Sequence, residues 1–361
     1  MMKLNPKSLL GLAMASALAL PAAAETVRVY NWSDYIAEDT IEKFTAATGI
    51  DVTYDVFDSN EVLEAKVLSG QSGYDIVVPT TDFMARQIKA GAYQKLDKSK
   101  IPNLKNLDPE LLKSLDNYDK GGEYSVPYQW GTNGVGYNVA KVQEILGDDA
   151  PTDSWDLVFD PKYADKLKDC GITMLDSASE ILPLAMNYLG LDPNSKNPAD
   201  YEKAQELLMK VRPDITYFHS SRYISDLANG EICVSVGWSG DIFQAASRAE
   251  EAENGIEISY YIPKEGTLMW ADMMVIPKDA KNVDAAHAWI NFILEPKIGA
   301  ELTNYIWYGS PNKASEEFID EEILSDPGIY PPKGTKLFTN ETMPMKIDRV
   351  MTRIWTAIKK G

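Results

Sequence analysis

The sequence predicts an α/β protein built from two domains. Its 361 residues are too many for one compact core and suit two. A composition of 45% hydrophobic and 25% charged residues is typical of a globular chain and argues against a disordered or fibrous protein. Strand and helix patterns alternate over residues 26–90 and again from about residue 132, which indicates mainly parallel sheets with right-handed crossovers.

The first 24 residues have the order of a secretory signal peptide. Lys3 and Lys7 precede a short apolar stretch over residues 9–20, and small residues then lead to Ala24. The apolar stretch of about 12 residues is too short to span a bilayer. We therefore expect cleavage after Ala24 and an exported protein.

Three strands alternate with three helices in the first segment. Polar and apolar residues alternate in the strands, whereas the helices carry apolar residues at helical spacing. Ser59 is expected to cap the second helix and Gly49 to end the first. The predicted strands cover residues 27–32, 50–57 and 75–79, and the predicted helices cover 38–48, 59–68 and 83–90.

The second segment repeats this pattern less regularly. A Gly-rich stretch over residues 131–138 suits a hinge, but it lacks the third glycine of a dinucleotide-binding loop. Strands are then expected over 232–238 and 257–262, with a helix over 242–251 between them. A further stretch, 267–275, gathers aromatic, acidic and Met residues.

Acidic residues outnumber basic ones by 54 to 35, which gives a formal net charge of −19. Loss of Lys3 and Lys7 with the signal peptide leaves 33 basic residues and a net charge of −21. Such a surface repels phosphate backbones and anionic lipids, so nucleic acid and membrane binding are not expected. Cationic small molecules become candidate ligands, and an acidic surface that serves only solubility is the alternative.

The two cysteines, Cys170 and Cys233, predict a disulfide because an exported chain meets an oxidising compartment. The alternative is a pair of buried reduced thiols. On the chain-entropy model the bridge stabilises the fold by roughly 4 kcal/mol. The cysteines and the only two histidines, His219 and His287, offer no usual metal-ligand spacing, so both imidazoles are interpreted as structural and no metal or cofactor is expected.

Aromatic and acidic residues occur together at three predicted strand ends. Ligands of α/β sheets bind beyond the carboxyl ends of the strands. An aromatic face attracts a cation, and a carboxylate accepts its hydrogen bonds, so the pairs favour an elongated diamine or triamine. For any single pair, a core aromatic and a helix cap are the alternative. The three pairs are Trp32 with Asp34, Trp238 with Asp241, and Trp270 with Asp272.

No common catalytic constellation is present. The sequence has neither the Gly-x-Ser-x-Gly elbow of a hydrolase nor the Gly-Lys-Ser/Thr motif of a phosphate-binding loop. Paired carboxylates with aromatics leave an exported carbohydrate-active enzyme as an alternative. The main expectation is a binding protein and not an enzyme.

Several motifs resemble segments of the periplasmic polyamine-binding proteins of ABC transporters, most closely the putrescine/spermidine branch. The resemblance covers essentially the whole chain after the signal peptide. It implies the two-lobed type II periplasmic binding protein fold, with a mainly parallel sheet flanked by helices in each lobe and ligand in the interlobe cleft. The motifs are YNWSDY at 30–35, PYQWGTNG at 127–134, DSWD at 153–156, YFHSS at 217–221, DLANG at 226–230 and DPGIYPP at 326–332.

The resemblance also implies an organisation and a function. One lobe would combine residues 25–130 with 255–308, and the other 131–254 with 309–361. The protein would be a periplasmic monomer that captures spermidine or putrescine and docks transiently on an ABC permease for import. A related lobed receptor for another small cationic solute remains the alternative.

By the same resemblance, twelve residues form the ligand site. Ala271 stands where a second aromatic would follow Trp270, and this indole is bulkier than the Phe of some relatives. Both changes alter the length of the slot and leave the choice between the two polyamines open, with spermidine favoured. The implied site residues are Trp32, Ser33, Asp34, Tyr35, Thr80, Glu180, Ser220, Trp238, Asp241, Trp270, Asp272 and Tyr308.

Overall fold

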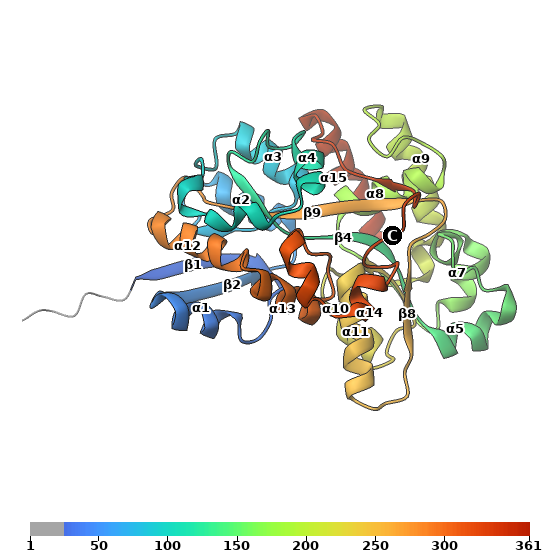
Figure 1. Ribbon diagram of the computed structural model, residues 1–361. Coiled ribbons are helices and arrows are strands. Elements are labelled where there is room, and N and C mark those ends of the chain that lie inside the picture. The colour runs from blue at the N-terminus through green and yellow to red at the C-terminus, as the bar shows by residue number, and fades with distance from the viewer. Residues whose placement is uncertain (1–24) are drawn as a thin grey trace, which may run out of the picture.

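Helices pack around one ten-stranded mixed sheet whose strand order is β2-β1-β3-β9-β4-β7-β5-β6, with β10 beside β9 and β8 beside β4 (Figure 1). The computed structural model describes residues 25–361, so the predicted signal peptide and its cleavage site lie outside the described residues. The predicted α/β class is confirmed.

Parallel strands occupy one end of the sheet, where β1 pairs with both β2 and β3. The side chain of Ser59 accepts the backbone N–H groups of Glu61 and Val62, and Gly49 ends its helix with a φ of 74°, as predicted. The elements are β1 (Thr26–Trp32), α1 (Thr40–Thr48), β2 (Asp51–Phe57), α2 (Asn60–Leu68), β3 (Ile76–Val77) and α3 (Thr81–Lys89).

A second group of parallel strands occupies the other end, where β5 pairs with both β6 and β7. The helix predicted over 242–251 begins three residues earlier, directly at the end of β7. The elements are β5 (Ile172–Met174), α8 (Ala178–Tyr188), α9 (Pro198–Val211), β6 (Ile215–Phe218), α10 (Arg222–Ala228), β7 (Val234–Trp238), α11 (Ser239–Glu251) and β8 (Ile258–Tyr261).

Two antiparallel strands, β4 (Ser125–Asn138) and β9 (Thr267–Val275), join these groups. β4 pairs with β9 through Thr132 and with β7 from Asn133 onward. The Gly-rich stretch is therefore extended strand. A Cβ atom on Gly131 would lie 2.9 Å from the rings of Trp270 and Tyr308, so glycine lets these rings reach the strand.

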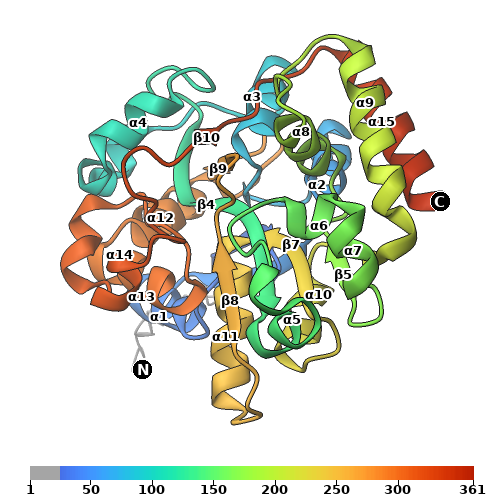
Figure 2. The same ribbon diagram turned by 90° about the vertical axis from the view of Figure 1, so that its right-hand side faces the viewer.

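The remaining helices cover the flanks of the sheet. The last helix, α15, lies beside α9, and the chain ends on the opposite side of the molecule from α1 (Figure 2). These elements are α4 (Pro109–Leu115), α5 (Val139–Leu146), α6 (Asp156–Phe159), α7 (Pro161–Leu167), α12 (Val283–Ile293), α13 (Pro296–Ile306), α14 (Glu321–Ser325), β10 (Leu337–Phe338) and α15 (Met345–Lys360). Short 3-10 helices cover Lys98–Lys100, Pro102–Asn106, Gly147–Asp149, Arg212–Asp214 and Lys313–Phe318.

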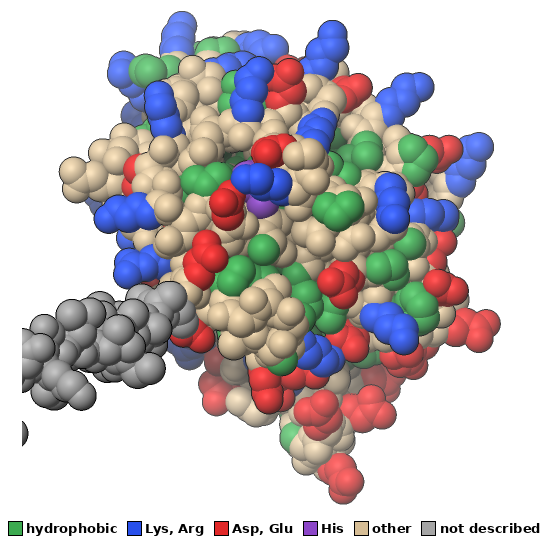
Figure 3. Space-filling view, turned by 60° about the vertical axis from the view of Figure 1, so that its left-hand side comes forward, with side chains coloured by type: hydrophobic (Ala, Val, Ile, Leu, Met, Phe, Trp, Pro, Cys, Tyr) green, Lys and Arg blue, Asp and Glu red, His purple; other side chains and the backbone are tan. Residues whose placement is uncertain are grey.

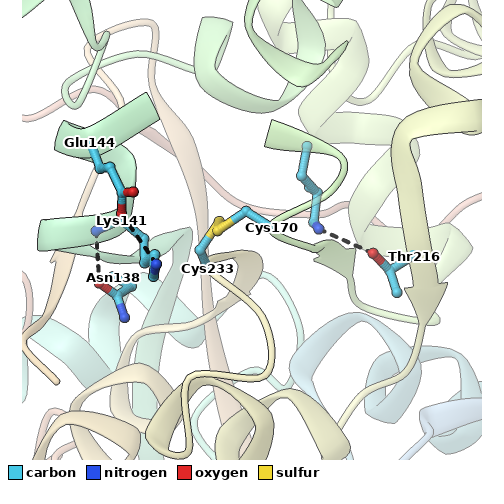
Figure 4. The surroundings of a disulfide bond; sticks show 7 residues. Asn138, Lys141, Glu144, Cys170, Thr216 and Cys233 are labelled. Atoms are coloured by element: carbon cyan, nitrogen blue, oxygen red, sulfur yellow. Dashed lines mark hydrogen bonds and ion pairs between the residues drawn. A yellow bond between two sulfur atoms is a disulfide. The ribbon is translucent and has the colours of Figure 1, made fainter. Parts of the chain in front are cut away.

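Cys170 and Cys233 form the predicted disulfide, with Cα atoms 5.6 Å apart (Figure 4). The bridge joins the segment after α7 to the start of β7. Both histidines have structural partners. His219 Nδ1 accepts backbone N–H groups of the following turn at 3.1 Å, and His287 Nε2 accepts the N–H of Asp97 at 2.9 Å.

The surface carries both signs of charge. On the face in Figure 3, Lys and Arg side chains are interspersed with Asp and Glu, and acidic side chains gather at the lower end, where Figure 1 places the end of α11. Much of the acidic excess therefore lies on solvated surface. Within residues 25–361, no helix is both long and apolar enough to cross a membrane.

Candidate functional site

A cavity lies where β1, α3 and β9 face α8 and α11. Ten of the twelve predicted site residues line it, although they come from segments far apart in the sequence. They are Trp32, Ser33, Tyr35, Thr80, Glu180, Trp238, Asp241, Trp270, Asp272 and Tyr308.

Asp241 lies at one end of this cavity, in the first turn of α11. Its Oδ1 accepts the hydroxyl of Tyr308 at 2.6 Å, and its Oδ2 accepts the hydroxyl of Tyr223 at 2.7 Å. Burial disfavours the charged form and raises the pKa of this carboxyl to about 7, although both hydrogen bonds oppose the shift. A cation beside Asp241 would lower this pKa and favour the ionised carboxylate.

Asp272 is a second buried acid. Its Oδ1 accepts the Thr80 hydroxyl at 2.8 Å, and Thr80 Oγ1 in turn accepts the amide of Asn60 at 2.9 Å. Burial raises the pKa of Asp272 to about 7 as well. The prediction that Trp270 and Asp272 follow a strand end is wrong, because both lie within β9 as it runs antiparallel past the cavity.

Glu180 stands in the first turn of α8. Its Oε2 accepts the side-chain amide of Asn133 and the indole N–H of Trp238, each at 2.7 Å. Burial raises the pKa of this carboxyl, and the two donors lower it. Glu180 thus holds the Trp238 ring in place and also adds negative charge to the cavity.

Aromatic rings form a connected row beside these acids. Trp32 meets Trp238 edge-on with ring centroids 5.5 Å apart, and Trp238 lies 6.4 Å from Trp270. Tyr308 continues the row, 5.4 Å from Trp270 and 5.1 Å from Tyr35. The rings supply flat apolar walls that suit a methylene chain and attract cations.

Two predicted site residues lie outside the cavity lining. Asp34 sits in the turn after β1 with a φ of 53°, and its carboxylate pairs with Arg248 at 2.7 Å. Ser220 lines a neighbouring groove, where its hydroxyl oxygen accepts the N–H of Asp176 at 3.2 Å. A direct ligand contact for either residue stays a prediction.

Eight further residues complete the lining. The rule that ligands bind beyond strand ends points to the residues after β3, which include Asp82. Asn60 and Asn340 carry no local signal, because only the tertiary fold brings α2 and the segment after β10 to this cavity. The additional residues are Asn60, Thr81, Asp82, Phe83, Ser179, Leu268, Met269 and Asn340.

The lining contains four carboxylates and no Lys, Arg or His. Three of its polar atoms are buried without a partner: Tyr35 Oη, Trp270 Nε1 and Asn340 Oδ1. Buried polar groups are normally paired, so these atoms indicate space that a ligand or water fills. Within residues 25–361, no group of three or more His, Cys, Asp or Glu is placed to hold a metal ion. The cavity suits an elongated organic cation.

Comparison with known proteins agrees with this geometry. A family model described as bacterial extracellular solute-binding protein matches residues 39–331. The chain is 55% identical over 366 residues to the putrescine-binding periplasmic protein SpuD of Pseudomonas aeruginosa and 50% identical over 369 residues to the putrescine-binding periplasmic protein PotF of Escherichia coli, with 100% of each chain covered. It also resembles the solved structure of a putative spermidine/putrescine ABC transporter from Listeria monocytogenes, with a TM-score of 0.82, 35% identity, and coverage of 93% of this chain and 99% of that chain.

Proposed function

The chain belongs to the bacterial extracellular solute-binding proteins, and from this premise we propose that it captures putrescine or spermidine and delivers it to an ABC permease. Its likeness to solved members confirms the type II periplasmic binding protein fold. One observation carries the proposal most strongly. Two buried acids, Asp241 and Asp272, face the same aromatic-walled cavity, and none of its lining residues is cationic.

The charges of the ligand complement those of the cavity. One ammonium group would bind Asp241 and another Asp272, while the methylenes between them pack on Trp270 and its neighbouring rings. Each ammonium favours the ionised form of the acid that it meets and so lowers a pKa that burial raises. Charge-assisted hydrogen bonds then offset the desolvation of both partners.

Binding is coupled to closure of two lobes in this proposal. One lobe comprises residues 25–130 with 255–308, and the other 131–254 with 309–361. Asp241 and Asp272 come from different lobes, so a diamine completes its contacts only when the lobes approach. Closure is favoured by the difference in ligand contacts between the open and closed states.

The proposed setting is the periplasm, after cleavage of the signal peptide at Ala24. The relatives SpuD and PotF are periplasmic proteins, which supports this location. The protein would act as a monomer that docks transiently on the permease. It would perform no catalysis, because its cargo leaves chemically unchanged.

A thermal-shift panel tests this function. Putrescine, cadaverine, spermidine and spermine are added separately to the purified protein, with glycine and arginine as amino-acid controls. A ligand that binds only the folded state raises its stability by RT ln(1 + [L]/Kd), or about 2.7 kcal/mol at a concentration 100 times Kd. We expect putrescine or spermidine to raise the melting temperature; absence of a shift with every amine would contradict the proposal.

A further inference from the structure

We infer that Asp82 forms a third cation subsite in the cavity, which makes the protein favour a triamine over a diamine. The inference rests on the proposed function and specifies the ligand within that class. Asp82 would be the residue that separates spermidine from putrescine.

Asp82 is the second residue of α3, and only 8% of it is exposed. The nearest cation along its own helix, Arg86, lines a smaller neighbouring cavity together with Asp82, and its charge lowers the pKa of Asp82. Its guanidinium pairs with Glu64 instead, with Nε 2.6 Å and Nη2 2.8 Å from that carboxylate. Within residues 25–361, Asp82 takes part in no ion pair closer than 4 Å. Its carboxylate is therefore available to a cationic ligand.

The cavity continues at this end. Asp82, Ser179 and Asn340 line both the main cavity and a smaller one beside it. The Nδ2 of Asn340 donates to the carbonyl of Ser179 at 2.9 Å, while its Oδ1 is buried without a partner. An ammonium group arriving here would meet a carboxylate and an amide oxygen, both of which accept N–H hydrogen bonds.

The four acids of the cavity are not equivalent. Asp241 and Asp272 suffice for the two nitrogens of a diamine. Each of Asp241, Asp272 and Glu180 accepts at least one side-chain hydrogen bond. Asp82 receives no side-chain donor, so a bound diamine leaves it buried and unneutralised. Burial raises its pKa to about 7; the charge of Arg86 opposes this shift, and the charge of Glu180 adds a smaller part to it. A third ammonium removes this penalty, and selectivity arises from that difference.

Isothermal titration calorimetry of Asp82→Asn with putrescine and spermidine tests the inference. The substitution keeps the shape of the side chain and removes its charge. We expect spermidine affinity to fall about tenfold or more, in line with the loss of a charge-assisted contact. Putrescine affinity should fall much less, because that ligand places no ammonium group at Asp82, so the ratio of spermidine to putrescine affinity should fall.

Asp284→Asn provides a matched control. Asp284 is also the second residue of its helix, α12, but it is exposed and lies outside the cavity lining. It controls for the loss of a carboxylate near a helix N-terminus and should leave both affinities unchanged. Asp82→Ser serves as a second variant, since Ser is well tolerated in the first turn of a helix.

The outcomes separate the two proposals. The third subsite is overturned if both Asp82 variants keep the parent's ratio of spermidine to putrescine affinity, whether the two affinities stay the same or fall equally. Failure of the parent protein to bind any polyamine contradicts the proposed function instead. Thermal melting without ligand checks folding, and the Asn variant should melt at or above the parent temperature because it no longer buries a carboxylate.

Discussion

The guanidinium of Arg248 lies 2.7 Å from the carboxylate of Asp34 and ties α11 to the turn that follows β1. The side chain of Gln244, one turn earlier in α11, also donates to the backbone carbonyl of Asp34 at 3.2 Å. Asp241, in the same helix, lines the cavity. The two contacts thus hold the α11 side of the cavity close to the strand that carries Trp32.

Arg248→Ala should weaken polyamine binding without removing any residue that lines the cavity. The ion pair is partly exposed, with 40% and 35% of the two side chains accessible, so its contribution is modest. We expect Kd to rise about two- to fivefold, mainly through faster dissociation. Surface plasmon resonance with immobilised protein measures the rates.

Lys264→Ala is the control for this change, because it breaks an exposed ion pair with Asp153 away from the cavity. It should leave both rate constants unchanged. Equal dissociation rates for Arg248→Ala and the parent protein would show that the Asp34 contact does not support the bound state.

Thr80→Val should weaken binding by removing a hydrogen bond that orients Asp272. The Thr80 hydroxyl donates to this carboxylate at 2.8 Å, and Val has the same shape without the donor. Hydrogen bonds to charged groups contribute about 1.5–3 kcal/mol, so calorimetry should show affinity about tenfold or more lower. Thr80→Ser retains the hydroxyl and should bind nearly as well as the parent. Equal binding by the Val variant would contradict this role.

Polyamine affinity should increase as the pH rises from about 5.5 to about 8. At the lower end of this range, binding should also release protons. In the unliganded protein, burial raises the pKa of Asp82, Asp241 and Asp272 to about 7 each. Bound ammonium groups favour the ionised acids, so each acid that is protonated beforehand loses its proton. Calorimetry in buffers of different ionisation enthalpy counts these protons. An affinity that is constant over this range would contradict the raised pKa values.

The same groups predict how the unliganded protein responds to pH. Each acid has an ordinary pKa of 3.8 and a folded-state pKa of about 7, so the folded chain binds more protons than the unfolded chain between these values. Their contribution to stability is therefore largest at low pH and is lost as the pH rises through this window. At pH 7.5 the Asp241→Asn variant should have a higher melting temperature than the parent protein. At pH 5 this difference in melting temperature should be smaller. The opposite trend would exclude this linkage.

Replacing both cysteines by Ser should lower stability and leave binding intact. The Cys170–Cys233 bridge closes a sequence separation of 63 residues, and on the chain-entropy model its loss costs roughly 4 kcal/mol. The melting temperature should fall by roughly 5–15 °C. Neither cysteine lines the cavity, so calorimetry should give an unchanged Kd at 20 °C or below. Weaker binding by a folded variant would link the bridge to the site.

Local sequence patterns predicted most of the first three strands and helices, because cap residues and apolar spacing act over a few residues. Ser59 and Gly49 mark helix ends without help from the rest of the fold. The antiparallel course of β9 could not be predicted in this way. It depends on pairing with β3 and β4, and it places Trp270 and Asp272 within a strand instead of after one.

The site shows a similar division. Trp32 and Asp241 follow from the rule that ligands bind beyond strand ends, and Glu180 and Tyr308 followed only from the family resemblance. Asp34 fits the same rule, yet its left-handed turn brings its carboxylate to Arg248. Asn340 reaches the cavity through tertiary contacts, such as the one with Ser179, that no local motif encodes.

The most direct test of Asp272 as an ammonium partner is calorimetric titration of Asp272→Asn with putrescine and spermidine, beside the parent protein and Asp153→Asn. Asp272 is buried in the cavity, whereas Asp153 is exposed and outside the lining. Leaving an ammonium unpaired in a buried site costs about 3 kcal/mol or more, so we expect affinity on the order of 100-fold lower for both amines. The Asp153 variant should match the parent. Parent-like affinity of Asp272→Asn for both amines would contradict the assignment of this cavity as the polyamine site.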